Sequence, residues 1–190
     1  MFKRSNITLL FAAALAMSGC KSVPLSDQKL YSHFTGVTDF SSFARSQTGN
    51  GEIVLLSPEI KAPEDWNQLI ISWNAAAPAG SYLKVEARAV ALRHKTKFYA
   101  LGSWTPDDRA FPRASVSGQH DSDGDVKVDT LELNQPATGV QIRLTLGGTN
   151  SGLPSLKFLG LSFCNTKITP PILPPNRAAW GKIIPVVERS

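Results

Sequence analysis

The chain has 190 residues, 20 of them Lys or Arg against 15 Asp or Glu, and it contains only two cysteines and three histidines. This length is enough for one domain with a real hydrophobic core. The positive charges are dispersed, which excludes the basic patch expected of a nucleic-acid-binding protein. His33, His94 and His120 lie far apart in the sequence, so their spacing does not indicate a zinc site.

The first twenty residues are predicted to be an export signal. Lys3 and Arg4 form a charged start, and residues 7–17 form an apolar run that is too short to span a bilayer as a helix. The run ends in small residues before Cys20 and so resembles a bacterial lipobox. We therefore expect residues 1–20 to be a lipoprotein signal peptide, with the lipid on Cys20 holding the protein on a membrane of the bacterial cell envelope. This would be the outer membrane in a diderm host. An ordinary signal peptide with an incidental cysteine is the alternative.

Residues 31–166 are predicted to form one all-β domain, after a polar tether at 21–30. Residues 81–92 and 140–146 alternate apolar and polar side chains with a period of two, which is typical of half-buried strands. Residues 30–43 can hold either an edge strand or a helical turn. Seven or eight strands with Gly and Pro turns indicate an antiparallel β-sandwich of the jelly-roll or galactose-binding type. The other expected strands are residues 52–57, 67–74, 98–104, 126–133 and 156–164.

The C-terminal part is predicted to leave this domain. Residues 167–179 contain two Pro-Pro pairs and are typical of a linker. Residues 180–190 resemble the opening strand of a further domain that would continue beyond Ser190, and a strand without partners does not fold alone.

Several short strings in order carry a resemblance to a known family. They are Ser57-Pro58-Glu59-Ile60, Ser72-Trp73-Asn74-Ala75, Val85-Glu86-Ala87-Arg88, residues 98–104, residues 115–119, Asp129-Thr130-Leu131 and Ala179-Trp180-Gly181. Over residues 34–190 the chain resembles the N-terminal part of bacterial secreted C39-like cysteine peptidase proteins, which have a papain fold. The resemblance implies that a β-sandwich precedes the peptidase domain.

The resemblance assigns no catalytic residue to this chain. The nucleophilic Cys, the His and the Asn or Asp of the family would all lie beyond Ser190, so we expect the chain as given not to be an enzyme. Cys164 lies before the linker and matches none of them. At the end of an apolar run, Cys164 is interpreted as a small buried hydrophobic residue rather than a reactive thiol.

Three carboxylates within five residues form a candidate metal site. Asp121, Asp123 and Asp125 could bind Ca²⁺, because hard cations favour clustered carboxylate oxygens. An EF-hand loop is excluded, since Val126 stands where that loop needs Gly. The alternative is a solvated hairpin turn without a metal, in which Asp and Gly serve the backbone. No other cofactor is expected.

Aromatic residues at strand ends form a candidate carbohydrate-stacking surface. Trp73, Trp104 and Tyr99, together with Asn74 and His120, could hold a sugar by ring stacking and hydrogen bonding. The alternative is that the two tryptophans pack inside the sandwich.

These observations lead to one preferred function and two alternatives. The preferred function is a lipid-anchored envelope module, the non-catalytic accessory or binding domain of a C39-like peptidase protein, which binds an envelope carbohydrate or protein. The first alternative is a truncated or frameshifted fragment of an active cysteine peptidase. The second is a structural envelope lipoprotein without a ligand.

Overall fold

The computed structural model describes residues 31–107, 109, 111, 116–148, 152–169 and 180–181. The predicted signal peptide with Cys20, the tether, most of the predicted linker and residues 182–190 lie outside these described residues. No helix in the described ranges is long and apolar enough to cross a membrane.

The described residues form ten strands, and every strand pair is antiparallel. The all-β prediction is therefore confirmed, but the expected seven or eight strands are too few. The short strands β2 and β6 escaped the sequence analysis because they are exposed and polar and carry no alternation. The strands are β1 Ser32–Val37, β2 Ala44–Gln47, β3 Ile53–Leu56, β4 Ile60–Ala76, β5 Ser81–Ala91, β6 His94–Lys95, β7 Tyr99–Trp104, β8 Gly124–Lys127, β9 Thr130–Gly148 and β10 Ser155–Cys164.

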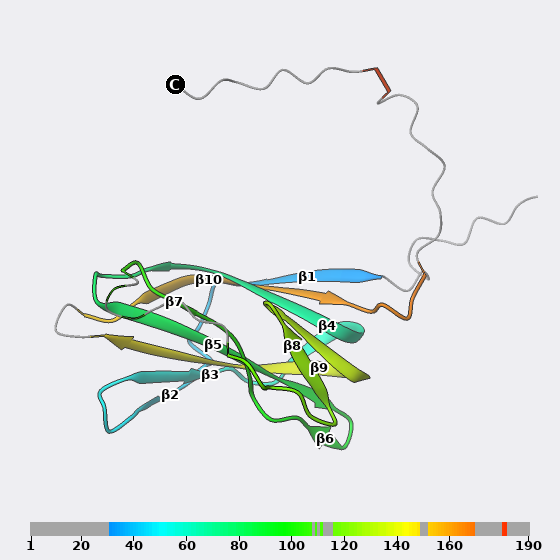
Figure 1. Cartoon of the computed structure of the whole chain (residues 1–190), viewed down its shortest axis with the longest axis horizontal. Helices are drawn as coiled ribbons and strands as arrows, with labels where there is room; N and C mark the ends of the chain where they lie inside the picture. The colour runs from blue at the N-terminus through cyan, green and yellow to red at the C-terminus, as the bar shows by residue number, and fades with distance from the viewer. Residues whose placement is uncertain are drawn as a thin grey trace, which may run out of the picture.

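Two long strands, β4 and β9, connect the two layers of the sandwich. The first layer has the order β1-β10-β4-β9-β8, in which β9 contributes residues 130–133. The second layer has the order β2-β3-β9-β5-β7, in which β9 contributes residues 139–148. Pro136 lies between the two halves of β9, where a residue without an N–H interrupts the ladder. In Figure 1, β1 and β10 lie together on one side of the domain and β2 and β3 on the other.

The core lies between the layers. The side chains that point into it are the apolar ones of the predicted alternation. Leu83, Val85 and Ala87 of β5 are fully buried, as are Leu159 and Leu161 of β10 in the opposite layer. Each fully buried Val or Leu contributes about 1.5–3 kcal/mol to folding, so these residues contribute strongly to stability.

The predicted strand at 126–133 is wrong, because the structure divides it by a tight turn. β8 ends at Lys127 and β9 begins at Thr130, and these two residues pair across the turn. Val128 has a φ of 62° and is 85 % exposed. The apolar residues stand at even positions before the turn and at odd positions after it. Val126 and Leu131 are partners across the turn, so their side chains face the same side.

Residues 30–43 hold an edge strand rather than a helical turn. β1 pairs only with β10, from Ser32 opposite Cys164 to Val37 opposite Leu159. Asn165 donates its backbone N–H to the carbonyl of Tyr31 at 2.9 Å, which brings the two ends of the domain together.

Candidate functional site

A loop at residues 116–123 is held against the free edge of β7. The side-chain amide of Gln119 donates to the carbonyl oxygen of Ala100 at 2.8 Å and accepts from its N–H at 2.6 Å. This pair of hydrogen bonds imitates one residue of a neighbouring strand, and Gln119 is only 9 % exposed. The loop is therefore fixed in place and covers an edge that would otherwise expose unpaired backbone groups.

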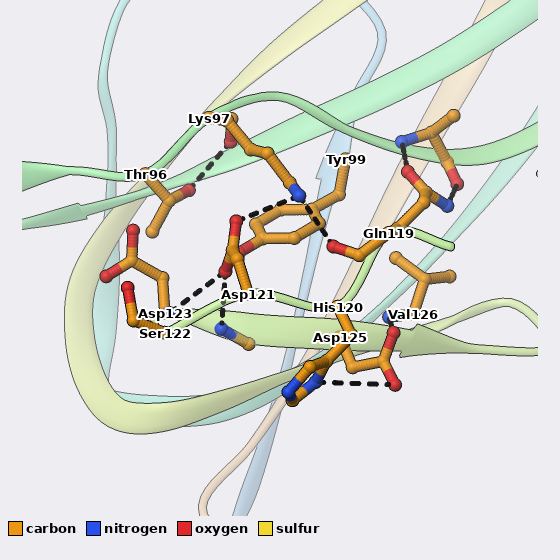
Figure 2. Close-up of polar contacts among 12 residues, drawn as sticks. Thr96, Lys97, Tyr99, Gln119, His120, Asp121, Ser122, Asp123, Asp125 and Val126 are labelled. Atoms are coloured by element: carbon orange, nitrogen blue, oxygen red, sulfur yellow. Dashed lines mark hydrogen bonds and ion pairs between the residues drawn. The ribbon is translucent and has the colours of Figure 1, made fainter. Parts of the chain in front are cut away.

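Asp121 is the centre of the polar contacts in this loop. Its Oδ1 accepts hydrogen bonds from the Tyr99 hydroxyl at 2.5 Å and from the N–H groups of Asp123 and Gly124 at 2.9 and 3.1 Å. Its Oδ2 forms an ion pair with Lys97 at 2.9 Å, as Figure 2 shows. Burial raises the pKa of the Asp121 carboxyl, but these donors outweigh burial and hold the pKa well below its usual range.

The pKa of the Tyr99 hydroxyl, at the buried end of this contact, is shifted in the opposite direction. Tyr99 is fully buried, and loss of water raises the pKa of its hydroxyl far above the usual value. The hydrogen bond to Asp121 and its negative charge raise that pKa further. The hydroxyl therefore stays protonated and serves as a permanent donor to the carboxylate.

Asp123 connects the loop to β6 and to the bend of β9. Its Oδ2 lies 2.8 Å from Nε2 of His94, and its carbonyl accepts the N–H of Asn134 at 2.9 Å. The side-chain amide of Asn134 also donates to the carbonyl of Ser122 at 2.9 Å. The exposed His94 and the partly buried Asp123 are therefore held at a defined position.

A pocket of about 60 Å³ lies directly beside the His94–Asp123 pair. The apolar side chains come from β5 and from the bend of β9, and the polar groups come from β6, Thr96, the loop and Gln135 in the same bend. A volume of this size admits a small group with one apolar side, such as a methyl or methylene group, and hydrogen-bonding atoms at the rim. The lining residues are Ala89, Ala91, Leu133, Pro136, Ala137, His94, Thr96, Ser122, Asp123 and Gln135.

The three predicted calcium ligands point to different partners. Asp121 contacts Tyr99 and Lys97, and Asp123 contacts His94. Asp125 accepts the N–H of Val126 at 2.8 Å and lies 3.9 Å from His120. Among the residues that the structure describes, no three His, Cys, Asp or Glu side chains are grouped to hold a metal ion. The Asp-rich stretch makes a turn that leads into β8.

The predicted stacking residues do not form one surface. Tyr99 has no exposed surface, so its ring packs inside the sandwich. Trp73 is partly buried against the core, and its ring lies 3.2 Å from the position that a Cβ of Gly102 would take in the opposite layer. Trp104, at the end of β7, is also partly buried. Asn74 and His120 are exposed, but they lie on β4 and in the loop before β8.

Cys164 ends β10 and is half-buried rather than fully buried. Hydrogen bonding to Cys164 raises the pKa of the Tyr31 hydroxyl above its usual value. Both residues line a gap of about 10 Å³ that also contacts His33. This volume corresponds to one water molecule and is too small for a substrate.

Two of the strings noted in the sequence, residues 85–88 and 98–104, meet on the outer face of the second layer. Arg143 of β9 donates two hydrogen bonds to Glu86 of β5, at 2.7 and 2.8 Å, and Lys84 lies 3.0 Å from the same carboxylate. The guanidinium groups of Arg143 and Arg88 lie over the ring of Phe98, at 4.1 and 4.7 Å from its centroid. Glu86, Arg88 and Phe98 therefore belong to one network that stabilises this face.

The fold and the pocket define an antiparallel β-sandwich domain with a small pocket beside a loop. The family model described as "Peptidase C39 N-terminal domain" matches residues 34–163, so the chain belongs to this family of N-terminal domains, of the actinobacterial type. A comparison with curated proteins finds no match.

Two solved structures match this chain at low identity. The C-terminal CBM6 of LamC, a marine laminarinase from Zobellia galactanivorans, is 13 % identical, with a TM-score of 0.33 over 68 % of this chain and 98 % of that one. The structure of infectious bursal disease virus Gt strain is 12 % identical, with a TM-score of 0.36 over 80 % of this chain and 36 % of that one. Neither similarity supports a functional assignment.

The pocket was not found from the sequence, although His94 and Asp123 had been noted separately. They are 29 positions apart, and only the folding of the loop onto β7 brings them together. The sequence offers only an Asp-rich turn and a distant histidine, and these two features have no fixed spacing.

Proposed function

We propose that the chain is the non-catalytic accessory domain of a C39-type peptidase protein, anchored to the bacterial cell envelope by a lipid on Cys20. The observation that carries this proposal is the family match, which is to an N-terminal domain and covers residues 34–163. The charged start, apolar run and lipobox-like residues before Cys20 support the anchor.

The pocket beside His94 and Asp123 is the proposed ligand seat of this domain. Its apolar lining and its imidazole, carboxylate and amide rim suit a polar envelope molecule, whether carbohydrate or protein. The hydrogen bonds of Asn134 and of Asp121 hold the rim before any ligand arrives, which lowers the entropy lost on binding.

The anchor is tested by expressing the full-length chain in a bacterium supplied with a labelled fatty acid. Cys20→Ala should lose the label and move the protein from the membrane fraction to the soluble fraction. Cys164→Ala is the matched control and should keep both properties. An unlabelled wild-type protein, or label that survives Cys20→Ala, would contradict the proposal.

The ligand seat is tested by filling it. Ala91→Leu should reduce retention on purified cell-wall material by about tenfold, because the added side chain occupies the pocket. Leu92→Ala changes the neighbouring residue, which is 91 % exposed and outside the pocket, and should bind normally. Equal binding by both variants would rule out this pocket as the seat.

A further inference from the structure

The outer face of the first layer carries two phenylalanines in a repeated arrangement. Phe34 and Gly36 on β1 lie opposite β10, which carries Phe158 and Gly160, and the two glycines are direct partners. The ring atoms Cε2 and Cζ of Phe34 lie 2.9 Å from the position of a Cβ on Gly160. Cε2 of Phe158 lies 3.0 Å from the corresponding position on Gly36. Each ring therefore covers the glycine of the other strand.

The glycines bring the rings down onto the sheet. Cζ is the ring atom farthest from its own backbone, yet in both residues it lies within 3.4 Å of a Cβ position on the neighbouring strand. The two side chains thus extend along the sheet rather than away from it. Their planes are inclined by only 25°, with centroids 6.3 Å apart, and Phe34 is 55 % exposed. The result is a low aromatic surface that water reaches.

The strand partners of the two rings, and the β4 partner of Gly160, are uncharged and polar. Ile70 lies two strands from Phe34 in the same row and is 43 % exposed. Ser162 stands between them, Ser72 is the partner of Gly160, and Asn74 is the partner of Phe158. We call this set, Phe34, Phe158, Ile70, Ser72, Asn74 and Ser162, the aromatic platform.

We propose that the aromatic platform binds an extended, neutral, β-linked polysaccharide. The C–H faces of successive sugar rings in such a chain lie close to one plane, which matches two nearly parallel phenyl rings, and the hydroxyl and amide groups beside them suit sugar hydroxyls. A protein partner would place protruding anchors in pockets, and a bilayer would favour side chains that project from the domain. This inference deepens the proposed function, because it names a ligand class, and it uses a surface distinct from the His94–Asp123 pocket.

The test measures depletion of the purified chain by insoluble cellulose and by insoluble chitin, with unfolding temperatures recorded for every variant. The wild-type protein should bind at least one polymer, and excess charged carboxymethyl cellulose should compete less well than neutral oligosaccharide. Phe34→Ala should reduce the affinity by about tenfold, which is the size expected for the loss of one aromatic contact. Leu92→Ala, which removes an exposed apolar side chain elsewhere, should bind normally.

A second variant keeps both rings and so separates stacking from folding. In Gly36→Ala the new methyl group would lie 3.0 Å from the ring of Phe158 and 3.8 Å from that of Phe34, so the Phe158 ring has to move away from the sheet. Its affinity should fall as in Phe34→Ala while the unfolding temperature changes little. Failure of the wild-type chain to bind either polymer overturns the proposal, as does unchanged binding in both variants.

The two tests separate the two surfaces. Failure of the platform and failure of the pocket are seen independently, because the polymer test changes only Phe34 and Gly36 and the cell-wall test changes only Ala91. Binding of the chain to vesicles of phosphatidylcholine and phosphatidylglycerol that is lost in Phe34→Ala, without binding to either polymer, would assign the platform to a membrane and overturn the carbohydrate assignment.

Discussion

The hydroxyl of Tyr99 donates to Oδ1 of Asp121 at 2.5 Å and thereby joins the core to the loop that forms the pocket. One end of this contact is fully buried and the other is partly in water. Because the same carboxylate also accepts two backbone N–H groups of the turn, the position of the pocket rim depends on a residue inside the sandwich.

Removal of the Asp121 carboxylate should destabilise the fold. We expect Asp121→Ala to lower the free energy of unfolding by about 2 kcal/mol, because the buried Tyr99 hydroxyl loses its acceptor. Tyr99→Phe should cost about 1 kcal/mol. The double variant should cost less than the sum, since no hydroxyl is then left without a partner. Urea unfolding of the wild type, the two single variants and the double variant measures these free energies. If the two single losses add up to the loss in the double variant, Tyr99 and Asp121 do not stabilise each other.

The same carboxylate should make stability depend on pH in the acid range. The pKa of Asp121 is lower in the folded protein than in the unfolded chain, where it is about 3.9. The unfolded chain therefore binds more protons between these two pKa values, and stability rises with pH through this window. The contribution is complete above about pH 5 and is lost as the pH falls below about 4. Urea unfolding from pH 2 to 7 should show a weaker acid slope for Asp121→Asn than for the wild type.

The ion pair between Glu86 and Arg143 should be costly to break from one side only. Arg143→Met should destabilise by about 2 kcal/mol, because the Glu86 side chain, 8 % exposed, keeps its charge without its bidentate partner. The value is below that of a fully buried pair, since Arg143 is 36 % exposed. The control is the double variant Glu86→Leu with Arg143→Met, whose free energy of unfolding should be closer to that of the wild type. A double variant less stable than Arg143→Met would contradict this account.

Val128 should be replaceable with a gain in stability. A β-branched residue with a φ of 62° is strained, and the left-handed region costs an L-residue about 1–2 kcal/mol. Val128→Gly removes that strain but makes the unfolded chain more flexible, so we expect a net gain of about 0.5–1 kcal/mol. Val116→Gly is the matched control: this valine is 51 % exposed and has no positive φ, so the change should destabilise slightly. Thermal unfolding checks this: the unfolding temperature should rise in Val128→Gly and fall slightly in Val116→Gly.

Local patterns in the sequence were enough for the fold class but not for its connections. The alternation of β5 at residues 81–91 and of β9 near 140–146 is visible because one face of each strand packs on the core. The division at Val128 was missed, because a valine is not expected at a turn position that favours glycine. The crossing of β4 and β9 between layers depends on pairings far apart in the chain, which have no local signal.

The candidate sites were harder to predict for the same reason. Tyr99 and Trp73 have the composition of a stacking surface, but alternation alone does not tell which face of a short strand is inside. The aromatic platform had a signal in the repeated Phe-x-Gly of residues 34–36 and 158–160. That signal has meaning only once β1 and β10 are known to be neighbours with the glycines in register.

The pairing of Ser32 with Cys164 places the first and last strands of the domain side by side, and the hydrogen bond from Asn165 to Tyr31 closes their ends. Neighbouring strands are about 4.8 Å apart, so the chain enters and leaves the sandwich at almost the same point. The domain therefore adds almost no end-to-end length to the chain, because its first and last strands are neighbours.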